Sequence, residues 1–345
     1  MFGENSLRSL FDFGDAGVQF FFVLSGFIIY YIHRVDVGRP SRVSTFFKKR
    51  VIRIYPVYIL VTLLLTPFWA FIPEFGAWYH KEFSAFVYSI LLMPQSHVPN
   101  LGVGWTLTHE MLFYLLFSLI IISRKWGGFI LVNWFASIIA INLIVRKDLG
   151  FPLSYFFSVN NLLFGLGILA SIMVLRRRSG TDRGWLLVIT GVLAFMVTGV
   201  GHNILNDQGL INSANSQLFI LFFGLASFLV VLQSGSQSVE RVLSKRKWLN
   251  VIGAASFSIY LIHQPVISLF RKLLELVGLH GYLGESLVFI AAMIISVSAG
   301  VVMYYLVERP MLRFFTRRYV RKPAAKVVPA VAVAIAADLQ RRDVA

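Results

Sequence analysis

The chain contains no cysteine. This excludes a disulfide framework, a thiolate nucleophile and a metal site with cysteine ligands. Charged residues are also scarce: they make up 14% of the sequence, against about 25% in soluble globular domains. Because 57% of the residues are hydrophobic, the composition indicates a polytopic membrane protein rather than a soluble domain.

Long apolar runs predict the transmembrane helices. A spanning helix needs roughly 20 predominantly apolar residues. The nine runs that satisfy this rule are approximately 16–33, 51–73, 104–123, 127–145, 154–175, 185–201, 216–233, 252–270 and 285–308. The apolar segment 83–93 is too short to cross, so we expect an interfacial or re-entrant piece there. The predicted fold class is an all-α transmembrane bundle.

Acidic residues are half as numerous as basic ones, and the formal net charge is +16. The connections 34–53, 124–125, 176–183 and 241–247, with the tail from Arg309, carry 26 of the Lys and Arg residues, whereas the alternate connections carry six. This alternation is the positive-inside pattern, which predicts an outside N-terminus and a cytoplasmic C-terminus. Topology alone therefore accounts for the charge, and we expect no nucleic-acid partner.

The predicted orientation leaves residues 1–15 outside, with no preceding helix to carry them across. We therefore expect that a first helix is missing, through truncation or a misplaced start codon. The predicted domains are a membrane-embedded region over residues 1–320 and a cytoplasmic tail over residues 321–345.

The stretch GWTLTHEMLFYLLF, residues 104–117, places Glu110 inside an apolar run. A carboxylate in a bilayer is costly unless a partner or a water-filled cavity receives it, so it marks a candidate functional site. Helical spacing puts Thr106 and Tyr114 on the face of Glu110, whereas His109 points about 100° away. The alternative is a glutamate that bonds a neighbouring helix and only fixes packing.

The stretch SIYLIHQP, residues 258–265, places a histidine inside another span. Counted from the predicted outer helix ends, His263 is about 10 Å deep and Glu110 about 9 Å deep. Two ionisable groups at one level predict an acid and base pair, because a histidine oriented by a carboxylate is a common general base. The alternative is a histidine bonded to a backbone carbonyl that Pro265 has freed.

The stretch STFFKKRVIRIYPVY, residues 44–58, concentrates basic side chains at the predicted cytoplasmic entrance to a span. Arg50 and Arg53 are three apart and share a helix face, so their guanidinium groups suit phosphate oxygens. The alternative is cytoplasmic anchoring alone. Together, a cytoplasmic anion site and an acid and base pair nearer the outer face predict group transfer from a phosphorylated cytosolic donor to an acceptor at or beyond the membrane.

Five stretches carry a more specific signal, and in chain order they are GVQFFFVLSGFIIY (17–30), FFKKRVIRIYPVY (46–58), GWTLTHEMLFYLLF (104–117), SIYLIHQP (258–265) and YYLVERP (304–310). Together they resemble the membrane-bound acyltransferase 3 family, which includes O-acetyltransferases of exopolysaccharide, O-antigen and nodulation factor. The resemblance implies a multi-pass protein of the bacterial inner (plasma) membrane that moves an acetyl or other short acyl group from acyl-CoA to a hydroxyl of a carbohydrate. It implies acetyl-CoA as the usual donor substrate, with no bound cofactor and no metal.

The resemblance also implies roles for individual residues. The basic motif is expected to meet the acyl-CoA phosphates through Lys49, Arg50 and Arg53. The candidate catalytic residues are Glu110, His263 and His109. The candidate substrate-binding residues are Ser25, Trp105, Tyr114 and Tyr260. The closing motif contributes Glu308, which we expect to be structural because it adjoins Arg309 at the inner interface.

Two other functions stay open from the sequence. The basic entrance and the intramembrane glutamate also suit a transporter or flippase of a lipid-linked or anionic substrate, although no paired repeat is visible. The family begins with a further helix that bears an arginine and a histidine, and nothing before Gly14 matches it. An inactive, truncated acyltransferase is therefore the other alternative.

Overall fold

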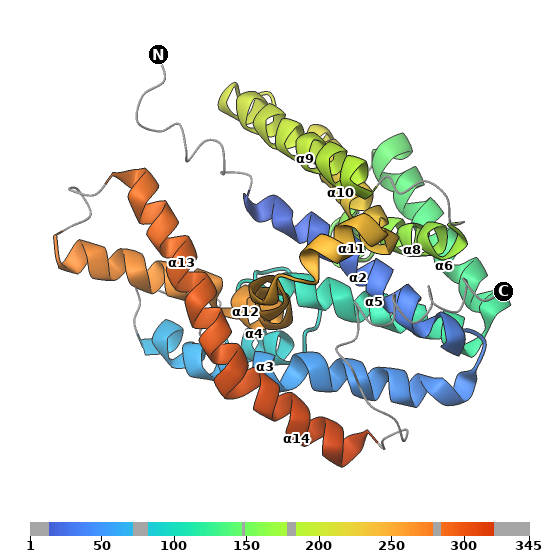
Figure 1. Ribbon diagram of the computed structural model, residues 1–345, viewed down its shortest axis with the longest axis horizontal. Helices are drawn as coiled ribbons and strands as arrows, with labels where there is room; N and C mark the ends of the chain where they lie inside the picture. Colours follow the sequence, from blue (N-terminus) through green and yellow to red (C-terminus); the bar gives the residue numbers. More distant parts are fainter. Residues whose placement is uncertain (1–13, 72–81, 147–148, 178–183, 279–283, 321–345) are drawn as a thin grey trace.

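The computed structural model describes residues 14–71, 82–146, 149–177, 184–278 and 284–320. These residues form a bundle of helices without a β-strand (Figure 1). In chain order the helices are η1 (Gly14–Ala16), α2 (Gly17–His33), η2 (Arg34–Asp36), η3 (Pro40–Arg42), α3 (Val43–Phe71), α4 (Phe83–Ile90), α5 (Gly104–Ile122), α6 (Arg124–Ile139), η6 (Ala140–Val145), α7 (Leu153–Phe156), α8 (Asn160–Arg176), α9 (Gly184–Asp207), α10 (Ser213–Leu232), η7 (Gln233–Gly235), α11 (Gln237–Leu243), α12 (Lys247–Leu276), α13 (Glu285–Met303), η8 (Tyr304–Glu308) and α14 (Arg309–Tyr319).

Nine helical segments of the described chain are long and apolar enough to cross a membrane, which confirms the predicted all-α fold. The helix α5 begins at the predicted residue, whereas α3 and α12 extend beyond their predicted spans. Their extra turns carry Lys and Arg, which are good helix formers that a hydropathy rule excludes. The outside N-terminus stays a prediction, and residues 1–13 and the tail 321–345 lie outside the described residues.

The bundle has a buried centre and a lipid-like exterior. The central helices are α2, α5 and α8, and the peripheral helices include α6, α9 and α13. On α6 the large side chains of Trp126, Phe129 and Val132 are 64%, 61% and 66% exposed. An apolar exterior over whole helices is what contact with lipid tails requires, so the structure is that of an integral membrane protein.

The central helices α2 and α8 approach each other through glycine. A Cβ atom at Gly26 would overlap the backbone carbonyl of Phe164, and one at Gly167 would overlap the backbone carbonyl of Val23. Small residues at such a crossing allow two membrane helices to pack backbone against backbone. This contact fixes the position of Ser25, which precedes Gly26 and faces α5.

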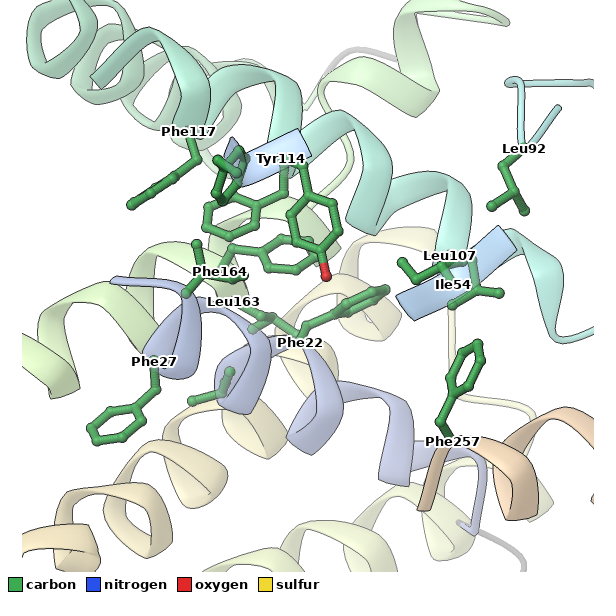
Figure 2. Packing of buried hydrophobic residues seen from close by; sticks show 14 of the residues in the cluster. Phe22, Phe27, Ile54, Leu92, Leu107, Tyr114, Phe117, Leu163, Phe164 and Phe257 are labelled. Atoms are coloured by element: carbon green, nitrogen blue, oxygen red, sulfur yellow. The ribbon is translucent and has the colours of Figure 1, made fainter. Parts of the chain in front are cut away.

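Aromatic rings fill the space between α2, α5 and α8 (Figure 2). The ring of Phe164 lies 4.9 Å from that of Phe22 and stacks on that of Phe113, with centroids 4.4 Å apart. The ring of Tyr114 is buried in the same cluster. Figure 2 shows its hydroxyl directed away from α5 toward α2. A polar group is thus held at a defined place within an apolar core.

A tight connection holds together the helix ends that carry the basic residues. The helix α5 ends at Ile122, and the next residue, Ser123, accepts a hydrogen bond on its side chain from the backbone N–H of Trp126. The backbone N–H of Gly38 donates to the carbonyl of Ile120 at 3.1 Å. The connection between α2 and α3 is therefore anchored to the same end of α5.

The opposite end of α5 is covered by the predicted short segment. The helix α4 has eight residues, which is too few to cross a bilayer. The hydroxyl of Tyr58 donates to the carbonyl of Ser89 at 2.8 Å, and the hydroxyl of Ser89 donates to Asn100 Oδ1 at 3.2 Å. These bonds tie α4 and the loop that follows it to α3, next to Gly104.

Candidate active site

One face of α5 carries a row of polar side chains. Thr106, Glu110 and Tyr114 are spaced four apart, so they follow one another at about 6 Å along the helix axis. Side chains of α2, α3 and α12 meet this row. We define the polar seam as Ser25, Arg50, Arg53, Thr106, Glu110, Tyr114 and Tyr260.

Glu110 is the centre of the polar seam, with 7% of its surface exposed. Its Oε1 accepts a hydrogen bond from the hydroxyl of Ser25 at 3.3 Å and a second one from the hydroxyl of Tyr114. Within the described chain, both hydrogen bonds of this carboxyl group end at Oε1. The other oxygen is therefore the atom that can meet a proton or a substrate group.

Two arginines of α3 approach Glu110 from a second side. The Arg50 guanidinium lies over the ring of Tyr114, 5.7 Å from its centroid. At the other end of α5, Tyr58 of α3 contacts Gly104. The two helices are thus antiparallel, and Arg53 falls level with Glu110. The positive charges of both arginines act on Glu110, so the seam pairs an acid with two cations.

The two arginines differ in exposure. Arg50 is half-buried, and its Nη2 lies 2.9 Å from Nε2 of His33. Arg53 is exposed, although it lies within a membrane-spanning segment. Lys49 is also exposed, on the adjoining turn, and its charge acts on His33 rather than on Glu110. Of the predicted donor-binding residues, Arg50 and Arg53 therefore act on Glu110 through their charge, and Lys49 does not.

Tyr260 of α12 closes the seam toward the Gly104 end of α5. Its hydroxyl lies 2.6 Å from Oγ1 of Thr106 and donates to the carbonyl of Val103 at 3.2 Å. Its ring stacks on Phe21 of α2, with centroids 5.8 Å apart. Three helices thus hold this hydroxyl one turn away from Glu110.

His263 does not lie level with Glu110, contrary to the expectation from helix ends. Its neighbour Gln264 sits beside Gly102, and Tyr260 sits beside Thr106. His263 is therefore about 10 Å from Glu110 along the axis of α5. The depth estimate failed because α12 continues to Leu276, past the predicted end at residue 270. The expected direct pair of these two groups is corrected accordingly.

One ring nitrogen of His263 has no hydrogen-bond partner among the described residues. Its Nδ1 lies 2.7 Å from the carbonyl oxygen of Tyr260. A carbonyl only accepts, so Nδ1 carries the proton and Nε2 has the lone pair. The carbonyl partner belongs to Tyr260, whereas the carbonyl that Pro265 frees in a helix is that of Leu261. The His263 ring thus bonds a backbone carbonyl, as the helix-kink alternative expected, but not the carbonyl that Pro265 frees. Its Nε2 can accept a hydrogen bond from a ligand.

His109 and Trp105 lie away from the polar seam, on the side of α5 that faces α8. Nδ1 of His109 is 2.9 Å from Oδ1 of Asn161, whose amide nitrogen donates to two backbone carbonyls. The ring of Trp105 packs edge-on against His109 and Phe22. His109 is thus buried in a packed core, as its 100° offset from Glu110 indicated, whereas Trp105 at the end of the helix is 37% exposed.

Sequence reasoning missed two buried contacts. His33 bridges Asp36 and Arg50; the three-residue spacing of His33 and Asp36 was a signal, but nothing in the sequence links them to Arg50. Glu308, expected at an interface, is 1% exposed and accepts a hydrogen bond from Ser258 at 2.5 Å. The closing motif therefore fastens η8 to α12 inside the bundle.

A family model described as "Acyltransferase domain", that of acyltransferase 3, matches residues 2–305. The chain belongs to the acyltransferase 3 family. The protein is thus a membrane O-acyltransferase, and the family resemblance read from the motifs is confirmed.

Curated relatives of the acyltransferase 3 family support the same assignment. Exopolysaccharide production protein ExoZ of Rhizobium meliloti (strain 1021) is 28% identical over 308 residues, which cover 88% of this chain and 91% of the relative. Acyltransferase MdmB of Streptomyces mycarofaciens is 26% identical over 358 residues, which cover 91% of this chain and 84% of the relative.

A third relative of the family is longer than this chain. O-acetyltransferase OatA of Staphylococcus aureus (strain NCTC 8325 / PS 47) is 27% identical over 286 residues, which cover 74% of this chain but only 46% of the relative. No solved structure matches the chain significantly.

Proposed function

We propose that the protein transfers an acetyl or other short acyl group from acyl-CoA to a hydroxyl of a carbohydrate at the bacterial inner membrane. The observation that carries the proposal is the Arg50 guanidinium over the ring of Tyr114, whose hydroxyl bonds the buried Glu110, with Arg53 three residues further along α3, in a chain of the acyltransferase 3 family. It combines an anion site with an acid in one seam between membrane helices.

The donor is proposed from the two arginines. Coenzyme A carries phosphate groups, and guanidinium groups bind phosphate oxygens through paired N–H donors. An arginine on a membrane-spanning helix is costly unless a polar partner or the interface receives its charge. The exposed Arg53 therefore calls for a polar neighbour beside α3. Acyl-CoA, with acetyl-CoA as the usual donor, would supply that neighbour and bring its thioester toward Glu110.

The acceptor is proposed from the relatives. One relative is named for exopolysaccharide production and another as an O-acetyltransferase. A carbohydrate hydroxyl fits both names, and the half-buried Tyr260, whose hydroxyl is held by Thr106 and the Val103 carbonyl, can accept a hydrogen bond from such a substrate near the Gly104 end of α5. His263 adds a free Nε2 acceptor on the same side. This end would receive the acceptor, and the end with the arginines would receive the donor.

The chemistry needs one base and one leaving group. The acceptor oxygen attacks the thioester carbonyl carbon, so that a C–O bond forms and the C–S bond breaks. The hydroxyl proton passes to Oε2 of Glu110, and Glu110 then gives this proton to the thiolate of coenzyme A as it leaves, which restores the carboxylate. Ser25 and Tyr114 hold Oε1 and so orient the carboxyl group for this transfer. The products are the carbohydrate ester and free coenzyme A.

The donor site is tested by the Michaelis constant for acetyl-CoA. Replacing Arg50 or Arg53 by Ala should raise this constant about tenfold or more, because each change removes charge-assisted hydrogen bonds worth about 1.5–3 kcal/mol. Lys48→Ala is the matched control, since this exposed cation lies on the same helix but is not among the charges that act on Glu110. An unchanged constant in both arginine variants would remove them from the donor site.

A further inference from the structure

A buried histidine connects the polar seam to the turn after α2. His33 is 3% exposed. Its Nδ1 lies 2.8 Å from Oδ2 of Asp36, and its Nε2 lies 2.9 Å from Nη2 of Arg50. The ring packs edge-on against Phe46, with centroids 4.9 Å apart. Neither the acid nor the histidine belongs to the residues that the motifs single out.

The partners of His33 fix its tautomer. An arginine side chain has only donors, so Nε2 must be the acceptor of this bond. The ring proton is therefore on Nδ1, from which it donates to Asp36. A doubly protonated ring would turn an N–H toward the Arg50 guanidinium and lose the bond. The contact with Arg50 thus exists only while His33 is neutral.

His33 restricts a guanidinium that has few other polar contacts. The Arg50 group lies over the rings of Phe46 and Tyr114, 5.8 and 5.7 Å from their centroids. Its Nε is buried and meets no acceptor among the described residues. The two rings limit the tilt of the guanidinium plane, whereas the bond to His33 sets its rotation within that plane. His33 therefore fixes the orientation of the Arg50 guanidinium beside the Tyr114 ring.

We propose that His33 is a positioning residue for Arg50. In this arrangement Asp36 holds the histidine in its Nδ1–H tautomer, Nε2 fixes the Arg50 guanidinium in the direction of the donor phosphates, and protonation of His33 releases it. This inference rests on the proposed donor site, because the binding of coenzyme A is its readout. It assigns the protein a pH-dependent affinity for its donor.

The charges around His33 define the direction of the effect. Asp36 of η2 faces the ring, as do Arg50 and Lys49 of α3, and Arg42 of η3 lies 3.9 Å from Asp36. Below the titration of His33 the ring is positive beside these cations and cannot accept from Arg50. Donor affinity should therefore fall as the pH falls, and recover as the pH rises.

The experiment is a titration of coenzyme A into the purified full chain between about pH 5 and 8, the range in which histidines titrate. His33→Gln keeps an acceptor oxygen but does not titrate, and His33→Leu removes the acceptor. His202→Gln is the matched control, because this histidine of α9 packs on Phe219 away from the seam. Melting temperatures of all variants are measured in parallel.

The expected result separates the variants by their pH profiles. The wild type and His202→Gln should bind coenzyme A about tenfold more weakly at the acid end, the loss that follows from one charged hydrogen bond. The phosphate monoester of coenzyme A itself titrates near about pH 6 in every variant. His33→Gln should therefore show a smaller pH dependence than the wild type at high affinity, and His33→Leu a smaller pH dependence at about tenfold lower affinity. If His33→Leu unfolds, the comparison of the wild type with His33→Gln decides alone.

Two results would overturn the inference, and they differ from failure of the donor site. A wild-type pH profile in His33→Gln, or wild-type affinity in His33→Leu, would mean that His33 does not position Arg50. Measuring Arg50→Ala in the same experiment shows whether the donor site or only the role of His33 is wrong. If that variant binds coenzyme A normally, the donor site itself is wrong. If it binds weakly while the His33 variants are normal, only the role of His33 is wrong.

Discussion

Replacing Tyr114 by Phe removes one hydroxyl from the polar seam and leaves the rest of the side chain in place. The ring still packs edge-on against Phe46, with centroids 5.9 Å apart, and still lies under the Arg50 guanidinium. What disappears is the hydrogen bond to Oε1 of Glu110. The remaining donor, Ser25, is 3.3 Å away, which is at the long end for a hydroxyl. The carboxyl group should therefore lose its main restraint.

The size of the effect follows from that single bond. A hydrogen bond to a charged group contributes about 1.5–3 kcal/mol, and each 1.4 kcal/mol is about a factor of ten. We expect kcat/KM for the carbohydrate acceptor to fall about 10- to 100-fold in Tyr114→Phe. Affinity for coenzyme A should stay within about twofold, because the contact of the ring with Arg50 remains.

The assay measures transfer of label from radiolabelled acetyl-CoA, with Tyr155→Phe as the matched control. Tyr155 also has a buried hydroxyl, but that oxygen meets no partner among the described residues. Its removal should leave kcat/KM within about twofold, since no bond is broken. Wild-type activity in Tyr114→Phe, or an equal loss in both variants, would refute the reasoning that the Tyr114 hydroxyl orients Glu110.

Two further predictions concern stability. Gly26→Ala should lower the melting temperature and the yield of folded protein, because the new Cβ would overlap the α8 backbone and overpacking costs about 1–3 kcal/mol or more; Gly128→Ala, which meets nothing within 4 Å, should leave both unchanged. Ser258→Ala should destabilise by about 1–3 kcal/mol, because it leaves the buried Glu308 without its hydroxyl donor; the exposed Ser256 gives a neutral alanine control in the same melting experiment.

Features that depend on helical spacing could be predicted from the sequence. Residues four apart on a helix share a face, and Tyr114 indeed bonds Glu110. The same rule separated His109 from Glu110, and that histidine bonds Asn161 on α8 instead. The bounds of α5 were also accessible, because Ser123 and Arg124 interrupt the apolar run at the residue where the helix ends.

Features that depend on the relative height of two helices could not be predicted. The charged Arg271 and Lys272 end the apolar run of α12, but they are good helix formers and the helix continues beyond them. The depth of His263 was therefore counted from the wrong end point. Hydropathy measures where a span leaves the membrane, whereas packing contacts such as Thr106 with Tyr260 set which residues lie level.

Contacts that the loops between helices bring about could not be predicted from the sequence either. His33 and Arg50 are 17 residues apart on different helices, and the turn between η2 and η3 brings them together. No periodic pattern encodes such a turn. The crossing of α2 and α8 at Gly26 and Gly167 is likewise a long-range contact. A single glycine in an apolar run does not predict such a contact.

The central claim is that Glu110 is the base in acyl transfer from acyl-CoA, and Glu110→Gln tests it most directly. The amide oxygen can still accept from Ser25 and Tyr114, so the seam should keep its shape while the proton acceptor is lost. The measurement is transfer of label from radiolabelled acetyl-CoA to an extract of the host's polysaccharide precursors, by purified wild type and variant. The account predicts transfer by the wild type and a loss of about 100-fold or more in Glu110→Gln. Transfer at the wild-type rate by Glu110→Gln would contradict it.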